Sequence, residues 1–244
     1  MSRTYFLNTN VDNLSMEETL VKIKQAIDKD QQLHHVVVNA GKIVAMQTDY
    51  QLRQSVNESD IINADGQAVV WASKILGKPL KERVAGVDLM INLVKLAAKN
   101  KYKIFFFGAK EEVVKAVVDN YSNQYSSELI AGYRNGYFKK EEEQEIARQI
   151  SDSGAHILFV AISSPMKENF LYANKGLLKK VKFFMGVGGS FDVVAGKVKR
   201  APLWMQNVGL EWFYRFVQEP KRMWKRYLVG NSKFILLVIK ERFG

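Results

Sequence analysis

The chain lacks cysteine and is poor in histidine. Without cysteine, its 244 residues form neither disulfide bonds nor thiolate metal sites, and they suit a reducing compartment such as the cytoplasm. Only three histidines are present, and His34, His35 and His156 do not have the spacing of metal ligands. The one Asp-x-Asp pair, Asp28 and Asp30, ends an amphipathic helical pattern and is typical of a solvated helix end. We therefore expect no bound metal and no cofactor.

Long apolar segments are also missing. The longest apolar run near the end, from Phe234 to Ile239, is far shorter than the roughly 20 residues that a membrane-spanning helix needs. At the other end, Met1 to Phe6 leads into a polar stretch rather than the apolar core of a signal peptide, so no export signal is expected. The sequence thus predicts a cytoplasmic protein that does not cross a bilayer.

Acidic residues are scarce in the last part of the chain. Residues 197–244 contain eleven Lys and Arg against three Glu, so this segment carries +8 of the total charge of +11. A positive field at one end attracts polyanions such as nucleic acid, anionic lipid headgroups or phosphorylated substrates. Composition alone does not distinguish among these.

Apolar strand-like runs alternate with helical patterns through most of the chain. In residues 111–121, for example, valines recur on one face of an expected helix. This alternation is typical of a parallel sheet covered by helices. We predict an α/β, Rossmann-like, mostly parallel sheet flanked by helices over residues 1–196. The expected strands cover residues 35–39, 60–63, 103–107, 129–132, 156–161 and 181–185.

The composition changes after Gly196. Aromatic side chains are interleaved with cations there, and Pro220 is expected to separate two short helices. We predict a small, basic, helical C-terminal appendage over residues 197–244. It is either a helix pair that caps the sheet or an interfacial surface, because aromatics beside cations suit the headgroup layer of a membrane. The aromatic residues are Trp204, Trp212, Phe213, Tyr214, Trp224 and Tyr227.

Candidate site residues follow the expected strands, since ligands of parallel α/β sheets bind beyond the carboxyl ends of the strands. Asp65 follows the second strand, either as the N-cap of the next helix or as a general base. Gly108 follows the third, either in a plain turn that starts a helix or in a turn whose backbone N–H groups bind a phosphate. Gly188 and Gly189 permit close approach of a ligand, and Asp192 is placed to accept hydrogen bonds from a ribose or base. The GxGxxG fingerprint is incomplete there, which disfavours a dinucleotide enzyme.

Several longer motifs resemble those of the WecG/TagA/CpsF glycosyltransferases, glycosyltransferase family 26. The central motif runs from Ile62 to Trp71 (INADGQAVVW) and continues from Gly77 to Leu89 (GKPLKERVAGVDL). The similarity covers nearly the whole chain, and several motifs in the right order are more specific than any one of them. The others are FGAK at 107–110, GYRNGY at 132–137, GGSFDV at 188–193, VKRAP at 198–202 and LEWFYR at 210–215.

The resemblance implies an inverting, metal-independent transfer. A nucleotide-activated sugar, typically UDP-linked N-acetylmannosamine or its uronic acid, passes to an N-acetylglucosaminyl-diphosphate-polyprenol. By this analogy Asp65 is the base that deprotonates the acceptor hydroxyl, and Arg83 and Asn39 help to hold the substrates. A metal-free enzyme needs other groups to neutralise the diphosphate, because negative charge builds on it as the bond breaks.

The appendage contains three candidates for that role. Arg215, Arg222 and Arg226 match the basic C-terminal motif of the family by position. The implied partners are therefore a UDP-sugar, a lipid-diphosphate acceptor and the anionic inner face of the cell membrane. The sequence leaves a homo-oligomer open.

Two residues depart from the family's pattern. Val37 stands where the teichoic-acid members commonly carry Thr, and Lys167 stands where Gln is expected. Both positions are expected to face the donor sugar. The stretch from Asn39 to Lys42 is more similar to the enterobacterial-antigen branch, which handles a uronic acid, and an extra Lys suits a carboxylate. The donor sugar stays open on this reasoning.

A non-catalytic protein that binds polyanions, nucleic acid included, is the alternative function. Mixed aromatic and basic residues occur in single-strand binders. The chain contains no recognised nucleic-acid motif, however, and an aspartate at the ligand edge of the sheet repels phosphates. We therefore expect no nucleic-acid partner.

Overall fold

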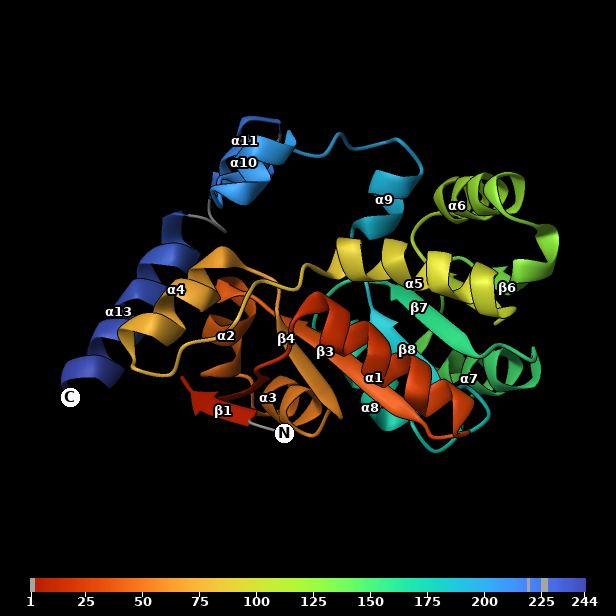
Figure 1. Ribbon diagram of the computed structural model, residues 1–244, viewed down its shortest axis with the longest axis horizontal. Helices are drawn as coiled ribbons and strands as arrows, with labels where there is room; N and C mark the ends of the chain where they lie inside the picture. Colours follow the sequence, from red (N-terminus) through yellow and green to blue (C-terminus); the bar gives the residue numbers. More distant parts are fainter. Residues whose placement is uncertain (1–2, 219, 225–227) are drawn as a thin grey trace.

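A six-stranded parallel sheet forms the centre of the protein. The computed structural model describes residues 3–218, 220–224 and 228–244, without the side chains of residues 207, 215, 222 and 223. The strand order is β4-β3-β8-β7-β5-β6 (Figure 1). All six strands expected from the sequence are present, with ends shifted by no more than two residues. They are β3 (Leu33–Val38), β4 (Ile61–Ala64), β5 (Ile104–Gly108), β6 (Ile130–Arg134), β7 (Ile157–Ala161) and β8 (Phe183–Gly186).

Helices cover both faces of this sheet because its strands are apolar on both sides. In β5, Ile104 and Phe106 pack in one cluster with α1, α5 and α6, whereas Phe105 and Phe107 pack in another with α7 and α8. Successive side chains of a strand point to opposite faces, so this segregation follows directly from the strand geometry. The helices are α1 (Met16–Asp28), α5 (Gly86–Asn100), α6 (Glu111–Gln124), α7 (Glu143–Asp152) and α8 (Met166–Ala173).

Shorter elements complete the α/β part. They connect or follow the strands named above and include the helices that begin shortly after the carboxyl ends of β3, β4 and β8. They are α2 (Ala40–Met46), α3 (Tyr50–Asn57), α4 (Gln67–Ile75), η1 (Ser127–Leu129), η2 (Lys140–Glu142) and α9 (Ser190–Val194).

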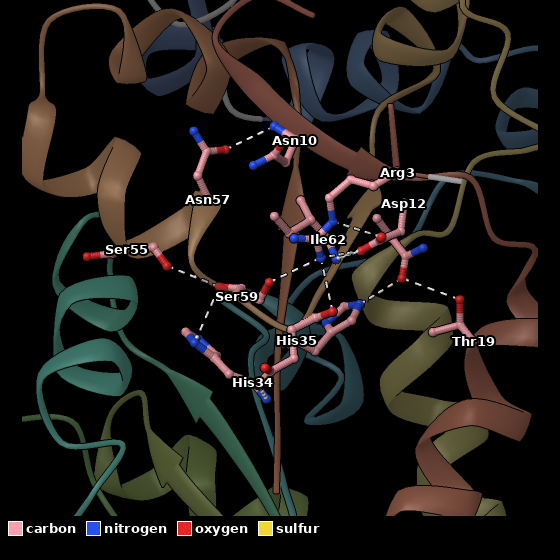
Figure 2. Close-up of polar contacts among 12 residues, drawn as sticks. Arg3, Asn10, Asp12, Thr19, His34, His35, Ser55, Asn57, Ser59 and Ile62 are labelled. Atoms are coloured by element: carbon pink, nitrogen blue, oxygen red, sulfur yellow. Dashed lines mark hydrogen bonds and ion pairs between the residues drawn. The ribbon is translucent and has the colours of Figure 1, made fainter. Parts of the chain in front are cut away.

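A small antiparallel hairpin, β1 (Arg3–Phe6) and β2 (Thr9–Asp12), protects the edge strand β4. The buried carboxylate of Asp12 accepts a hydrogen bond from the backbone N–H of Ile62 at 2.8 Å and pairs with Arg3 at 2.9 Å (Figure 2). Arg3 also donates to the carbonyl oxygen of Asp60 at 3.0 Å. Exposed strand edges invite pairing with other chains, so the hairpin and its carboxylate satisfy this edge internally.

Helices follow the α/β part as expected, and the last of them returns to it. Pro220 separates α11 from α12, which confirms the predicted break. Phe234 and Val238 of α13 are buried in the same apolar cluster as Val36 and Val38 of β3, and α13 lies beside α2 and α4 (Figure 1). Within the described residues, no helix is both long and apolar enough to span a membrane. The helices are α10 (Leu203–Asn207), α11 (Glu211–Gln218), α12 (Pro220–Trp224) and α13 (Gly230–Phe243).

Candidate active site

A large cleft opens at the carboxyl ends of the parallel strands. Its volume is about 1210 Å³. The chain places polar groups there because the segments after β3, β4, β7 and β8 all converge on this edge. The cleft brings together most of the predicted site residues, namely Asn39, Asp65, Lys167, Gly188, Gly189 and Asp192.

Asp65 directly follows β4, but it does not cap the helix after it. The N-cap of α4 is Gly66, and no side chain caps that helix. The N-cap interpretation of Asp65 is therefore wrong. Instead, Oδ1 of Asp65 accepts a hydrogen bond from the backbone N–H of Gly86 at 3.0 Å, at the start of α5. This bond fixes the carboxylate at the cleft wall and leaves a second oxygen for substrate chemistry.

Asn39 occupies the equivalent place after β3. It is the N-cap of α2, and its Oδ1 accepts a hydrogen bond from the N–H of Lys42 at 3.0 Å. A Cβ on Gly66 would lie 3.5 Å from Cβ of Asn39, so the two strand ends approach closely. Val37 lines the cleft on the same side. The capping bond holds the Asn39 side chain in one orientation beside the Asp65 loop.

The floor of the cleft contains a buried ion cluster. Glu168 is only 2% exposed and lies 2.7 Å from Nζ of Lys42 and 2.9 Å from Nζ of Lys167. Burial opposes its ionisation, but the two lysines outweigh that effect and lower the pKa of Glu168 to about 2. Lys167 crosses Gly186 at the end of β8, where a Cβ would meet its side chain at 2.7 Å. Both lysines line the cleft, so its floor carries one excess positive charge.

The glycines at the far end of the cleft differ in role. Gly108 does not line the cavity, although its neighbours Ala109 and Lys110 do. Its φ is +124°, and a Cβ there would lie 2.5 Å from the backbone of Ala161, so this glycine serves the close approach of β5 and β7. Gly188 lines the cleft with φ +52°, and a Cβ there would meet nothing within 4 Å. It thus leaves open space for a ligand.

A second, mainly apolar cavity of about 490 Å³ joins the cleft. It runs between α4 and α13 and shares Asn39, Gly41, Asp65 and Glu211 with the first cavity. Arg83 lines this second cavity rather than the cleft. The family resemblance implied that Arg83 helps to hold the substrates, but it did not indicate which of the two cavities Arg83 lines.

Arg83 belongs to an ionic network that joins the appendage to the α/β part. Its guanidinium lies 3.0 Å from Oε2 of Glu211 in α11. Oε1 of Glu211 lies 3.8 Å from Nε of Arg200, which forms a bidentate pair with Asp88 of α5. This pairing with Asp88 and the proximity of Glu211 raise the pKa of Arg200. The network positions the start of α11 against the edge of the sheet where the cleft opens.

The model of the WecG/TagA/CpsF glycosyl transferase family matches residues 4–244. The chain belongs to this family. A Bacillus subtilis (strain 168) relative is 39% identical over 214 residues, covering 87% of this chain and 82% of the relative. A Bacillus spizizenii relative is 37% identical over 186 residues, covering 76% of this chain and 70% of the relative. Both are named N-acetylglucosaminyldiphosphoundecaprenol N-acetyl-β-D-mannosaminyltransferase.

As a member of the WecG/TagA/CpsF family, the chain is a glycosyltransferase. This decides against the non-catalytic, polyanion-binding alternative. Of the three predicted cations of the appendage, Arg215 lies in α11 and Arg222 in α12, while Arg226 lies outside the described residues. No group of three or more His, Cys, Asp or Glu in the described part of the chain is arranged to hold a metal ion.

Three charged residues that pair beside the two cavities were not singled out from the sequence. Arg200 and Glu211 lie inside the family motifs VKRAP and LEWFYR, but no role was assigned to either. The sequence did not predict that Glu168 is buried, because a glutamate near the start of a helix is ordinarily exposed to solvent. Its neighbour Lys167 was the available clue, since a cation placed in a cleft floor needs a counter-charge.

Proposed function

We propose that the protein is an inverting, metal-independent glycosyltransferase. It transfers a sugar from a UDP-sugar to a polyprenyl-diphosphate-linked N-acetylglucosamine. The observation that carries this proposal is the place of Asp65, which lines both the polar cleft and the apolar cavity at the point where they meet. A nucleotide sugar suits the first space and a lipid-linked acceptor the second, so the carboxylate lies where the two substrates react.

The chemistry at this junction is a single displacement. The acceptor hydroxyl oxygen forms a bond to the anomeric carbon of the donor while its proton passes to the Asp65 carboxylate. The bond between the anomeric carbon and the β-phosphate oxygen breaks, and its electron pair leaves with UDP. Attack from the side opposite the diphosphate inverts the anomeric configuration. Asn39, held by its capping bond, is placed to orient the reacting sugars.

Backbone N–H groups and cations stabilise the departing diphosphate in this proposal. The start of α6, including Lys110, and the turn at Gly188 and Gly189 line the donor end of the cleft. N–H groups at such a helix start favour phosphate oxygens. Asp192 in the first turn of α9 suits a ribose or base. Arg215, Arg222 and Arg226 supply further positive charge from the appendage.

The donor sugar is an N-acetylhexosamine or its uronic acid. The named Bacillus relatives transfer N-acetylmannosamine. Lys42 and Lys167 line the cleft beside Glu168, and their ammonium groups suit a sugar that carries a carboxylate. A panel of UDP-sugars, with the products weighed by mass spectrometry, distinguishes the two.

Replacement of Asp65 by Asn tests the proposal. The amide keeps an oxygen for the N–H of Gly86 but removes the base, so turnover is expected to fall by about 10²–10⁴-fold. UDP binding and the melting temperature should stay near the wild-type values. The assay uses a UDP-sugar and a GlcNAc-diphosphate-lipid in EDTA, because the proposed mechanism needs no metal.

Asp49 provides the matched control. It lines the same cleft, but its carboxylate caps α3 by accepting from the N–H of Leu52 at 2.9 Å. Asn is an equally good N-cap, so Asp49→Asn should retain activity. Near-normal kcat in Asp65→Asn would refute the base assignment. Strict dependence on added Mg²⁺ or Mn²⁺ would refute the metal-free mechanism.

A further inference from the structure

The apolar cavity between α4 and α13 is a groove with a defined direction. Its floor and one wall come from Ala68, Ala72 and Ile75 of α4. Glu211 and Arg83 lie at one end, where the groove joins the cleft. The wall from α13 is made by residues at helical spacing, namely Phe234, Ile235, Val238, Ile239, Arg242 and Phe243.

This wall is apolar although it is largely exposed. Phe234 and Val238 are buried against α2 and anchor the helix, while Ile235, Ile239 and Phe243 stay exposed on the adjoining stripe. Large apolar side chains that gather along one exposed groove indicate a binding surface rather than ordinary surface variation. The apolar side chains of this stripe are exposed to water. An apolar ligand that fills the groove removes them from water, which makes its binding favourable.

We propose that this groove binds the first isoprene units of the acceptor lipid, which rests on the proposed function. The groove begins at Asp65, where the acceptor sugar must lie, and it continues away from the cleft along α13. The acceptor consists of a polar sugar, a diphosphate and a hydrocarbon chain in that order. The protein presents a polar cleft, a cation and an apolar groove in the same order. Arg83 stands at the junction, where the diphosphate would pass, and exchanges its contact with Glu211 for a phosphate oxygen.

The geometry also favours a lipid over a protein helix as the occupant. The groove opens directly onto the carboxylate of Asp65, so a hydrocarbon chain that is attached to the acceptor enters it from the reacting end. The named relatives act on an undecaprenol-linked substrate, so a hydrocarbon chain is attached to the acceptor that this groove would meet.

The test compares acceptors that differ only in prenyl length. GlcNAc-diphosphate is attached either to one isoprene unit or to a chain of several units, and both are assayed in the same detergent micelles without a bilayer. The double variant Ile235→Ser with Ile239→Ser should raise KM for the long-chain acceptor by about tenfold or more, since each buried CH₂ group contributes to binding. Its kcat, its donor KM and its KM for the one-unit acceptor should stay near wild type.

Leu236→Ser is the matched control. Leu236 is 65% exposed against 56% for Ile235 and neighbours it on α13, but it does not line the groove. It should leave KM unchanged for both acceptors. A second groove variant on the opposite wall, Ile75→Ser, should reproduce the selective rise in KM.

Three outcomes would overturn the proposal. The first is that the wild-type enzyme has the same KM for the short and the long acceptor. The second is that Leu236→Ser changes KM as much as the groove variants do. The third is a change of oligomeric state in the double variant, which would make the groove an interface between copies of the chain. Failure of the proposed function is distinguishable, because wild type would then glycosylate neither acceptor.

Discussion

Glu168 shows how one residue holds a charged cleft floor together. Lys42 and Lys167 approach its carboxylate from two different helices, and all three side chains are buried. Ser164 donates a further hydrogen bond to Oε2 of Glu168 at 2.8 Å. A buried charge without a partner is costly, so the two lysines depend on this carboxylate.

We expect Glu168→Gln to destabilise the protein by about 3–5 kcal/mol, because it removes the carboxylate that two buried ammonium groups share. Urea unfolding at neutral pH measures this. The control is Glu145→Gln, whose exposed pair with Arg148 should contribute less than about 1 kcal/mol. Equal effects of the two variants would show that the cluster does not stabilise the fold.

Position after a strand predicted which side chains reach the cleft, while their roles there stay predictions. Asn39, Asp65, Gly188 and Asp192 all reached the cleft, because parallel strands present their carboxyl ends at one edge. For Gly108, the structure adds a reason that the sequence did not predict, since a Cβ there would meet the Ala161 backbone and the glycine permits the close approach of β5 and β7. Its part in donor binding stays a prediction.

At the scale of single elements, β3 contains two buried histidines that face different neighbours. Burial, reinforced by Lys175, lowers the pKa of His34 to about 3. Burial and Lys42 lower the pKa of His35 to about 4, against the hydrogen bond that its ring donates to Oδ1 of Asn63, which raises it. Both side chains are therefore neutral in the folded protein at any ordinary pH.

Carboxylates also face these histidines and oppose the shifts. Asp60 and Glu168 act on His34, and Asp12 acts on His35. Because desolvation still dominates both sites, the unfolded chain binds more protons than the folded one below pH 6.5. The histidine contribution to stability is fully present above that pH and is lost as the pH falls toward the folded pKa values.

We expect the free energy of unfolding to fall by about 2 kcal/mol per histidine between pH 7 and pH 5. Urea titrations at these pH values measure the slope. His34→Gln should remove about half of it while lowering stability at pH 7. The half-exposed His156 provides the control, because His156→Gln should change the slope less. A pH-independent unfolding free energy over this window would contradict the burial argument.

The same scale shows what sequence patterns cannot predict. The six parallel strands were predicted because each is an apolar run long enough to stand out. The β1–β2 hairpin was missed, since its strands are short and polar and its Leu7-Asn8 turn has positive φ without glycine. It is held by long-range bonds such as Asp12 to Ile62, which no local pattern reveals.

At the scale of the whole molecule, charge and exposed apolar surface gather at one end. Among the described residues, most exposed large apolar side chains follow residue 202, including Trp204, Leu228 and Leu236. The same segment carries +8 of the net charge. Aromatic and aliphatic groups beside cations favour the interface of an anionic membrane. Because α13 packs into the core, this surface has a fixed orientation relative to the cleft.

We expect Lys221→Gln, Lys233→Gln and Lys240→Gln together to weaken binding to anionic vesicles by about 100-fold at low salt, since each cation near the surface contributes about 1 kcal/mol. Vesicle cosedimentation at low and high salt measures this, and the difference from wild type should shrink as salt screens the attraction. Turnover of a detergent-solubilised acceptor should not change, because these three lysines line neither cavity.

The matched control removes the same charge from the opposite side. Lys99 and Lys101 end α5 and Lys179 precedes β8, so all three lie at the amino-terminal edge of the sheet, away from the cleft. Changing them to Gln lowers the net charge equally, yet it should leave vesicle binding nearly intact. If both triple variants lose binding alike, net charge rather than a docking surface attracts the protein to the membrane. The groove on α13 would then need another means of reaching its lipid.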